Sequence, residues 1–378
     1  MSRYRSVLRI PDLPCHFGPM PTPDNFAELP NVLPFELALD TEIGILRQIP
    51  APNLGEVLHR AYEHGNVFGT PLADDAFGGA YADDFLEFIN RTAIAGRERL
   101  RILEVGAGAG YISLKLGEAG HTVTSIEPGS SYRHYWERYG IKVLNTFFPT
   151  PEAPGPFDLV VSYGVLEHIE DTVAFIRAMV EHLAPGGKIV AAVPNDSEEI
   201  LVGDPGMLAH EHYLYFMPPA FRRLLEAGGV KVDILEEAKH SRVLFATGHA
   251  GNPTRTAMPE SEADTYLSYG AKFERFQQAV RDALDENARA GRTLGVYCPS
   301  RSMAVLPRDI AARFFDDAAY NKSKFFPPFA IPIEDKADLF AAPVDEMWIM
   351  SRSFSGVIAR NIAPATEGAV VRTIEEFQ

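Results

Sequence analysis

The chain has 378 residues, 46% of them hydrophobic and 23% charged, which is the composition of an ordinary folded protein with room for two or three domains. Its net charge of −16 argues against a nucleic-acid-binding surface, because neutralising phosphates requires a basic stripe and none is present. Two cysteines, Cys15 and Cys298, are too few for a disulfide framework or a metal cluster. The chain shows neither a secretory signal nor a window approaching eighteen apolar residues, so we expect a cytoplasmic protein without a membrane span.

The first fifty residues are rich in proline and lack periodicity, which predicts an irregular, packed lobe over residues 1–80. Strand and helix patterns then alternate at the intervals of a doubly wound sheet. Strands are expected at 101–105, 121–128, 157–163 and 188–194, and helices from about residue 83, at 112–120 and at 171–184.

A loop over residues 195–217 interrupts this alternation, and Pro218 and Pro219 then begin a helix that glycines end at 228–229. Segments 230–238 and 241–249 read as a strand pair that closes the sheet, so residues 81–250 form one domain. A polar linker follows. Residues 251–378 contain an amphipathic helix marked by Phe273, Phe276, Val280 and Leu284, with buried strands near 293–300 and 346–351, which predicts a second, smaller α/β domain.

A glycine-rich turn follows the first strand of the central domain. Gly106, Gly108 and Gly110 have the spacing G-x-G-x-G, one residue shorter than the G-x-G-x-x-G of dinucleotide folds. Glu104 ends the strand, and a carboxylate at that point would repel a diphosphate but suits a cationic ligand. A tight turn that binds nothing is the alternative. We expect the three glycines to lie against the ligand.

The run E-V-G-A-G-A-G resembles motif I of class I S-adenosylmethionine (SAM) methyltransferases, and FDLVVSYGVLEHIED and LAPGGKIVAAVPN resemble later motifs of that family. The resemblance implies a Rossmann-like seven-stranded fold, SAM as methyl donor with S-adenosylhomocysteine as product, and no metal. Glu127, at the end of the second strand, would accept hydrogen bonds from the ribose. The cofactor-binding residues implied are Glu104, Gly106, Ala107, Gly108, Gly110, Tyr111, Glu127, Pro128, Tyr163 and Gly164.

A second resemblance concerns the flanking segments. AHEHYLYFM is similar to the HEH loop of sugar C-methyltransferases, which methylate nucleotide-linked keto-deoxysugars, and residues 321–362 are similar to their C-terminal Rossmann-like domain. That family has a zinc-binding N-terminal lobe, but residues 33–48 contain no cysteine here, and Cys15 with His16 cannot complete a four-ligand site. We therefore expect the lobe without zinc. The family also has a tyrosine where this chain has Ala209.

The resemblance assigns catalysis to Glu211 and His212 in this loop, with His168 of the fourth-strand motif as a further candidate. A histidine with a pKa near neutrality suits proton abstraction. Loop histidines are often solvated, and His168 has the alternative of capping the next helix. Tyr213, Tyr215, Asn321 and Lys322 are the substrate-binding candidates, with core packing and a solvated turn as their alternatives.

The leading hypothesis is C-methylation of a nucleotide-linked keto-deoxysugar through an enolate. The alternative is O- or N-methylation of a sugar or another secondary metabolite, and a second alternative is a SAM-binding module without turnover. In each catalytic case the partner is a small-molecule acceptor. We expect no nucleic-acid or membrane partner, and the sequence leaves monomer and homodimer open.

Overall fold

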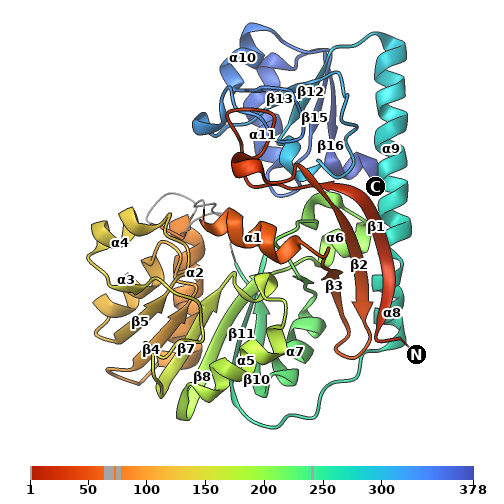
Figure 1. Ribbon diagram of the computed structural model, residues 1–378. Coiled ribbons are helices and arrows are strands. Elements are labelled where there is room, and N and C mark those ends of the chain that lie inside the picture. Colours follow the sequence, from red (N-terminus) through yellow and green to blue (C-terminus); the bar gives the residue numbers. More distant parts are fainter. Residues whose placement is uncertain (1, 64–71, 74–77, 240–241) are drawn as a thin grey trace.

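The computed structural model describes residues 2–63, 72–73, 78–239 and 242–378, and three sheets organise them. A small antiparallel sheet contains the N-terminal strands, a seven-stranded sheet occupies the middle of the chain, and a five-stranded parallel sheet lies near the C-terminus. Figure 1 shows the C-terminal unit above the central one, with the N-terminal strands beside both. No helix among these residues is long and apolar enough to cross a membrane.

The central sheet confirms the expected class I arrangement. Its spatial order is β6-β5-β4-β7-β8-β11-β10, and β11 runs antiparallel to both of its neighbours. The reversed strand pair therefore closes one edge, as predicted. The strands are β4 (Arg101–Val105), β5 (Thr122–Ile126), β6 (Val143–Leu144), β7 (Phe157–Tyr163), β8 (Leu183–Pro194), β10 (Val230–Glu237) and β11 (Val243–Ala250).

Helices cover both faces of the central sheet because β4, β7 and β8 carry apolar side chains on both sides. On one face, α2 (Gly78–Ile89) and α3 (Tyr111–Glu118) pack Phe85 and Ile112 against the sheet. On the other face, α5 (Thr172–Glu181) and α7 (Pro218–Ala227) contribute Ile176 and Leu224. Each fully buried side chain of this size contributes about 1.5–3 kcal/mol. The helix after residue 171 ends at Glu181, four residues before Pro185.

The N-terminal segment differs from the irregular lobe that its prolines predicted. Strands β1 (Tyr4–Pro14), β2 (Val32–Asp40) and β3 (Ile45–Ile49) form an antiparallel sheet, and β9 (Leu214–Tyr215) of the central domain joins it as a fourth strand. Pro11 and Pro34 both fall in the irregular step where the register shifts between the pairs Ile10–Phe35 and Leu13–Leu33. A bulge tolerates prolines that a regular ladder would reject, so the sheet survives them.

The C-terminal unit is a parallel sheet with the order β14-β13-β12-β15-β16, which confirms a second, smaller α/β unit. Its strands are β12 (Leu294–Tyr297), β13 (Arg313–Phe315), β14 (Ile333–Glu334), β15 (Glu346–Ile349) and β16 (Val370–Thr373), and its helices are α9 (Tyr269–Ala290), α10 (Lys336–Ala341) and α11 (Ser355–Ile362). The remaining helices are α1 (Leu54–Glu63), α4 (Arg133–Tyr139), α6 (Ser197–Val202) and α8 (Glu260–Leu267).

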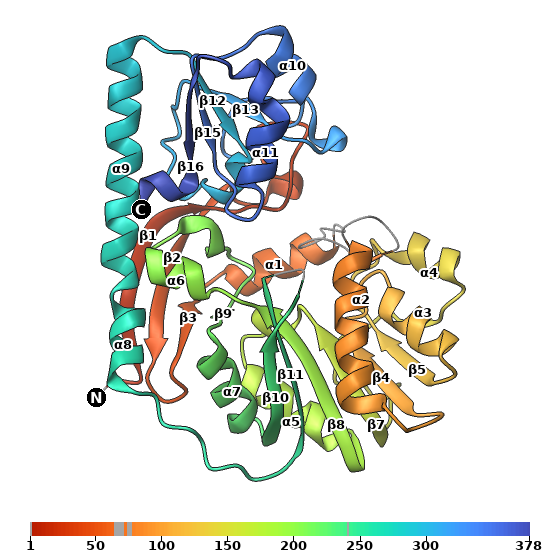
Figure 2. The same cartoon turned by 180° about the vertical axis from the view of Figure 1, so that it is seen from behind.

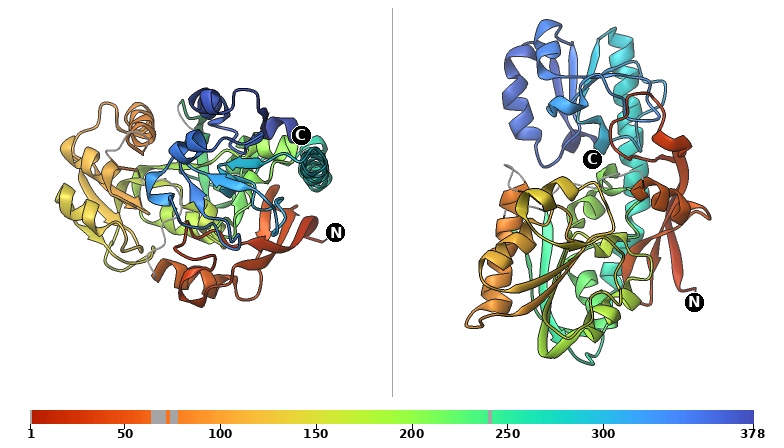
Figure 3. Two further views of the ribbon diagram at one scale, coloured as in Figure 1. Left: turned by 90° about the horizontal axis from the view of Figure 1, so that it is seen from above. Right: turned by 60° about the vertical axis from the view of Figure 1, so that its left-hand side comes forward.

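The long helix α9 runs along the side of the molecule from the N-terminal strands to the C-terminal sheet (Figures 2 and 3). Its first turn touches β1 closely, because a Cβ added at Gly270 would lie 2.1 Å from the Val7 carbonyl oxygen. Glycine is therefore required at this contact. The helix links two parts of the chain that the sequence separates by some 250 residues. The boundaries near residues 80 and 250 stay predictions.

The side chain of Arg223 on α7 joins three separate segments. Its guanidinium donates to the carbonyl oxygens of Ile43 and Gly44 in the β2–β3 turn and forms a two-point ion pair with Glu262 of α8. The Arg223 side chain is 2% exposed and that of Glu262 is 11% exposed. The hydroxyl of Tyr266 donates to the same carboxylate at 3.0 Å. Buried hydrogen bonds from α7 thus connect the N-terminal sheet to the central domain.

Replacing Arg223 by methionine should lower the free energy of unfolding by about 3–5 kcal/mol, because it leaves the Glu262 carboxylate buried without its cation. The neighbouring Arg222, whose guanidinium donates to the Val232 carbonyl at 3.4 Å, is the matched control, and Arg222→Met should change the free energy of unfolding by about 1 kcal/mol or less. Urea unfolding followed by fluorescence measures both. Equal losses for the two variants would contradict the anchoring role.

Candidate active site

The turn after β4 is held in shape by its own backbone. The amides of Gly106 and Ala107 both donate to the Ile126 carbonyl oxygen at 2.9 Å, and the Gly110 amide donates to the Ala107 carbonyl at 2.8 Å. Gly106, Gly108 and Gly110 have φ angles of 74°, 52° and 81°, in the left-handed region that favours glycine. The turn therefore wraps the carboxyl end of β5.

The three glycines approach different things. A Cβ added at Gly106 would lie 2.3 Å from Cγ2 of Val165, and one added at Gly110 would lie 2.2 Å from Cδ1 of Ile141. A Cβ at Gly108 would meet no atom within 4 Å. The expectation that all three glycines lie against a ligand stays a prediction, because these contacts concern only the side on which a Cβ would project. Two of them permit close packing within the protein, and Gly108 borders open space.

Glu127 lies directly after β5, and its carboxylate is engaged by the backbone. It accepts hydrogen bonds from the amides of Gly108 at 2.9 Å and Gly129 at 2.7 Å, while the Nδ2 group of Asn145 holds the Glu127 and Pro128 carbonyls. Burial raises the pKa of Glu127, and the two amide bonds oppose that rise. The carboxylate is thus positioned beside the open face of Gly108.

Glu104 is buried at the end of β4, where the hydroxyl of Ser113 donates to its carboxylate. The Ser113 hydroxyl also contacts that of Ser125, at 2.5 Å. Burial raises the pKa of Glu104 to about 8, and the nearby Glu127 adds to the rise although Ser113 opposes it. Two buried carboxylates therefore flank the glycine turn, and neither is paired with a lysine or arginine among the described residues. A positively charged ligand would relieve this arrangement.

The other residues expected at the cofactor site surround the same turn. Tyr111 begins α3 and its hydroxyl donates to Asp83 at 3.2 Å. Tyr163 ends β7 with its ring 5.2 Å from that of Phe85. Gly164 follows at φ 64°, and its amide donates to the Ala192 carbonyl at 3.0 Å. The carboxyl ends of β4, β5 and β7 thus meet around one space, as in open α/β sheets.

A second group of polar residues lies where the turn after β7 meets the HEH loop. The 3₁₀ turn Leu166–His168 carries Glu167 and His168, and the Tyr213 amide donates to the Glu167 carbonyl at 2.7 Å. Nδ1 of His168 lies 2.9 Å from the Glu211 carbonyl oxygen. The rings of His168 and His212 are 4.9 Å apart. The structure therefore brings together all three predicted catalytic residues.

Burial dominates the electrostatics of this group. It raises the pKa of Glu167 to about 8, and Asp196 adds to the rise, whereas it lowers the pKa of His168 to about 4. His168 does not cap the following helix, because the N-cap of α5 is Asp171, whose side chain accepts from the Ala174 amide. One carboxylate oxygen of Glu167 and one ring nitrogen each of His168 and His212 lie within 4.8 Å of one another.

The N-terminal sheet fixes the HEH loop in place. The buried Gln48 of β3 donates from its side-chain Nε2 to the carbonyls of His210 at 2.9 Å and His212 at 3.2 Å. Its backbone N–H donates to the Tyr213 carbonyl at 2.9 Å. The His210 ring lies 3.1 Å from the Leu13 carbonyl in β1. Residues far away in the sequence thus set the loop geometry.

The four residues expected to bind substrate divide between two places. Tyr213 and Tyr215 lie in the HEH loop, but the hydroxyl of Tyr215 is fully buried and bonds to the Ala209 carbonyl at 3.1 Å, so it closes the loop. Asn321 and Lys322 belong to the C-terminal unit. Lys322 pairs there with Asp335 at 2.7 Å and Asp338 at 2.9 Å.

Sequence reasoning missed Tyr62 and the proximity of Cys15. The pKa of Tyr62, near the end of α1, is raised by burial and then by Glu211, Glu127 and Glu167, so the phenol lies within electrostatic reach of both acidic groups. Burial, and then Glu211, raises the pKa of Cys15 to about 12. A thiol with such a pKa is a poor metal ligand. No local pattern marks either residue.

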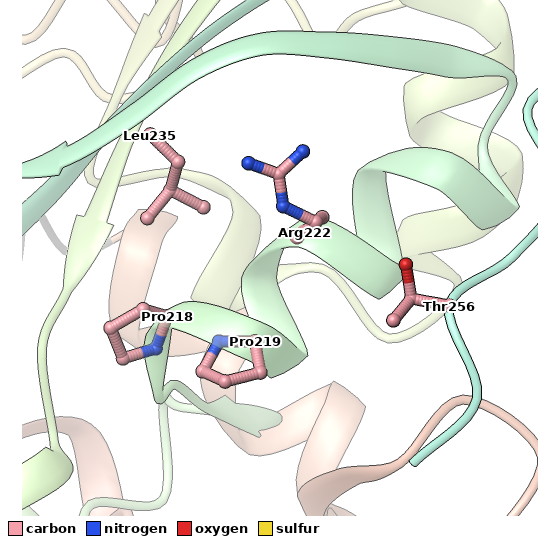
Figure 4. Close-up of a pocket in the computed structure, with 5 residues that line it drawn as sticks. All are labelled: Pro218, Pro219, Arg222, Leu235 and Thr256. Carbon is pink, nitrogen blue, oxygen red and sulfur yellow. The ribbon is translucent and has the colours of Figure 1, made fainter.

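A shallow hollow lies elsewhere, between α7, β10 and the segment that leads to α8. Its lining consists of Pro218, Pro219, Arg222, Leu235 and Thr256 (Figure 4). None of the predicted site residues borders it, and it contains no pair of titratable groups that could perform acid–base chemistry. We therefore place the candidate active site at the carboxyl edge of the central sheet.

Part of the chain is similar to known proteins. Residues 78–234 match the family model of a methyltransferase domain. Two curated relatives are ubiquinone biosynthesis O-methyltransferases. That of Caulobacter sp. (strain K31) is 30% identical over 152 residues, which is 35% of this chain and 60% of the relative. That of Paramagnetospirillum magneticum (strain ATCC 700264 / AMB-1) is 31% identical over 152 residues, which is 36% of this chain and 61% of the relative. The chain thus spans about 60% of the length of these relatives.

Among solved structures, N-methyltransferase NodS from Bradyrhizobium japonicum WM9 in complex with S-adenosylhomocysteine is 21% identical, with a TM-score of 0.38 over 50% of this chain and 97% of that one. The Burkholderia thailandensis 1,6-didemethyltoxoflavin-N1-methyltransferase is 16% identical, with a TM-score of 0.39 over 61% of this chain and 99% of that one.

Gly106→Ala should destabilise the turn more than Gly108→Ala does. Both substitutions add a side chain at positive φ, but only the Cβ at residue 106 would overlap the Val165 side chain, whose Cγ2 lies 2.3 Å from it. We expect Gly106→Ala to lower the thermal unfolding midpoint by several degrees beyond Gly108→Ala. Adding Val165→Ala should recover part of that difference. No recovery in the double variant would refute the packing explanation.

Proposed function

We propose that residues 78–234, which match a methyltransferase domain, form a class I SAM-dependent methyltransferase domain, and that the chain transfers a methyl group from SAM to a small-molecule acceptor. The observation that carries this proposal is the pair of buried carboxylates, Glu104 and Glu127, at the ends of adjacent strands around a turn whose Gly108 faces open space. An uncompensated pair of this kind favours a cation.

The residues present fit SAM in charge and in shape. SAM supplies an electrophilic methyl group on a sulfonium and also carries an ammonium group. Glu127 would hold the ribose, since acidic side chains at this position can accept from two hydroxyls. Glu104 would attract the positively charged end, and the approach would be over Gly108, because Gly106 and Gly110 face protein. Charge and access therefore agree on one orientation for the donor.

We favour oxygen as the acceptor atom. The two curated relatives named above are O-methyltransferases, and a hydroxyl needs only one base to become a nucleophile. His212 is the candidate base, because it lies on the loop that faces the turn after β7 and His168 has its pKa lowered to about 4 by burial. Tyr62 supplies a phenol to the same region, where Ala209 lacks the tyrosine of the sugar C-methyltransferases.

Carbon methylation of a nucleotide-linked keto-deoxysugar is the second candidate. It is favoured by the HEH loop and by the five-stranded parallel sheet of the C-terminal unit, whose order reverses between β12 and β15, where open α/β sheets bind ligands. In that reaction the same base would remove a proton from the carbon next to the ketone. A SAM-binding module without turnover is the third reading, and it shares the donor site but not the catalytic one.

Donor binding should depend on pH through Glu104. Its pKa is raised to about 8 in the free protein, and a bound cation favours the ionised form, so binding below that pKa releases a proton. The affinity for SAM should therefore rise between pH 6.0 and 7.5, by up to about tenfold per pH unit. The ligand's own α-amine begins to lose its proton near pH 7.5, so the dependence on Glu104 is best measured between pH 6.0 and 7.0.

Isothermal titration calorimetry in two buffers of different ionisation enthalpy measures both the affinity and the released proton. Glu104→Gln should bind SAM more weakly and with a flatter pH dependence, and the exposed Glu118→Gln should match the wild-type chain. An affinity for SAM that does not change with pH in the wild-type chain would refute the role of Glu104. Absence of binding altogether would refute the proposed function.

His212→Asn should lower turnover by about 100-fold or more and leave the affinity for S-adenosylhomocysteine within about twofold of the wild-type value. Methyl transfer from labelled SAM to a phenolic acceptor and to a nucleotide-linked keto-deoxysugar measures turnover. Exchange of the sugar's α-proton with deuterated water, measured with S-adenosylhomocysteine present, separates carbon from oxygen methylation. Unchanged turnover in the variant would remove His212 from the reaction.

A further inference from the structure

We propose that Glu167, His168 and His212 form a binding site for one divalent transition-metal ion. The sequence predicts no metal, because the N-terminal segment lacks the cysteines of a zinc-binding lobe. In the described residues, one oxygen of Glu167 and one ring nitrogen of each histidine all lie within 4.8 Å of one another. The group comes from two separate segments, the turn after β7 and the HEH loop.

The strongest indication is the Glu167 side chain itself. Glu167 is only 3% exposed, and its Oε2 atom has no hydrogen-bond partner among the described residues. An orphaned carboxylate oxygen in the interior costs about 1–3 kcal/mol or more. A bound cation would satisfy both the charge and the unused oxygen.

His168 already has the orientation of a metal ligand. Its Nδ1 lies 2.9 Å from the Glu211 carbonyl oxygen, which can only accept, so the ring proton is on Nδ1 and the lone pair is on Nε2. Metal-bound histidines commonly donate their second nitrogen to a backbone carbonyl in this way, which fixes both tautomer and ring direction. The tautomer needed for coordination is therefore set before any ion arrives.

The backbone that carries these ligands is held on both sides. The Tyr213 amide bonds to the Glu167 carbonyl at 2.7 Å, and Nε2 of Gln48 bonds to the His212 carbonyl at 3.2 Å. Metal–nitrogen bonds are about 2.0–2.1 Å long, so the three ligand atoms would need to close in by about an ångström. Rotation of the partly exposed His212 ring can supply that movement without shifting the backbone.

Two imidazoles and one carboxylate select the class of ion. Mg²⁺ and Ca²⁺ prefer ligand sets made of oxygens, whereas imidazole suits Zn²⁺, Fe²⁺, Co²⁺ and similar ions. Three protein ligands would leave at least one coordination position for another group. On the proposed function, that position would receive an acceptor oxygen, and the ion would lower the pKa of a hydroxyl or stabilise an enolate. A coordinated His212 would have no free lone pair, so with the ion bound this activation would replace His212 as the base. Ion binding itself does not depend on that role.

The experiment uses the full chain, dialysed against EDTA and then titrated with zinc chloride by calorimetry, with cobalt chloride and visible absorption as a second readout. We expect one tight site per chain and cobalt bands of a nitrogen- and oxygen-ligated ion. Glu167→Gln and His212→Asn should each weaken binding at least about tenfold. The exposed Glu170→Gln, three residues away, is the matched control and should bind as the wild-type chain does.

The variants keep the test decisive. If Glu167→Gln unfolds, the partly exposed His212→Asn carries the comparison, with circular dichroism confirming its fold. Wild-type binding no tighter than that of His212→Asn overturns the metal site and leaves Glu167 as a neutral acid that shares a proton with its neighbours. Metal binding without SAM binding would sink the proposed function alone. SAM binding without metal binding would sink this inference alone.

Discussion

The site depends on how the HEH loop is held between two sheets. The Tyr213 amide bonds to the Glu167 carbonyl on the side of the central sheet, and Gln48 bonds to the loop from the N-terminal sheet. Strand β9 continues that loop as the fourth strand of the N-terminal sheet, so its backbone has partners in both directions. The catalytic candidates are therefore positioned by hydrogen bonds to the main chain of their loop, one of them from the main chain and two from the Gln48 side chain. Side-chain chemistry in this region rests on a scaffold contributed by residues 4–49.

Much of the central domain could be predicted from local sequence. Strands β4 and β7 begin and end where alternation and apolar runs placed them, and the glycine turn follows β4 as expected. These elements are legible because a strand buried on both faces is continuously apolar, and because positive φ at Gly106 and Gly110 restricts the residue type. Glu104 and Glu127 can be recognised as site residues because an acidic side chain is unusual at the end of a continuously apolar strand.

What could not be predicted arises from contacts between distant segments. Prolines at residues 11 and 34 suggested irregular backbone, but they fall together at one bulge, a pairing that neither segment shows alone. Tyr62 and Gln48 reach the candidate site only because α1 and β3 pack beside it. Glu167 looked like an ordinary residue of the fourth-strand motif. Its isolation becomes visible only when every hydrogen bond around it is known.

Buried acidity unites the donor site and the proposed metal site. Glu104 and Glu127 lie at the ends of β4 and β5, and Glu167 lies just beyond β7, so three desolvated carboxylates face neighbouring parts of one sheet edge. Glu127 raises the pKa of Glu104, Asp196 raises that of Glu167, and burial raises both pKa values to about 8, which favours the protonated forms near neutrality. On the proposed function, a sulfonium donor would compensate the first pair, whereas Glu167 belongs to a different turn. Glu167 therefore needs a cation of its own or must keep a proton, and that choice decides whether the acceptor meets a Lewis acid or a neutral carboxylic acid.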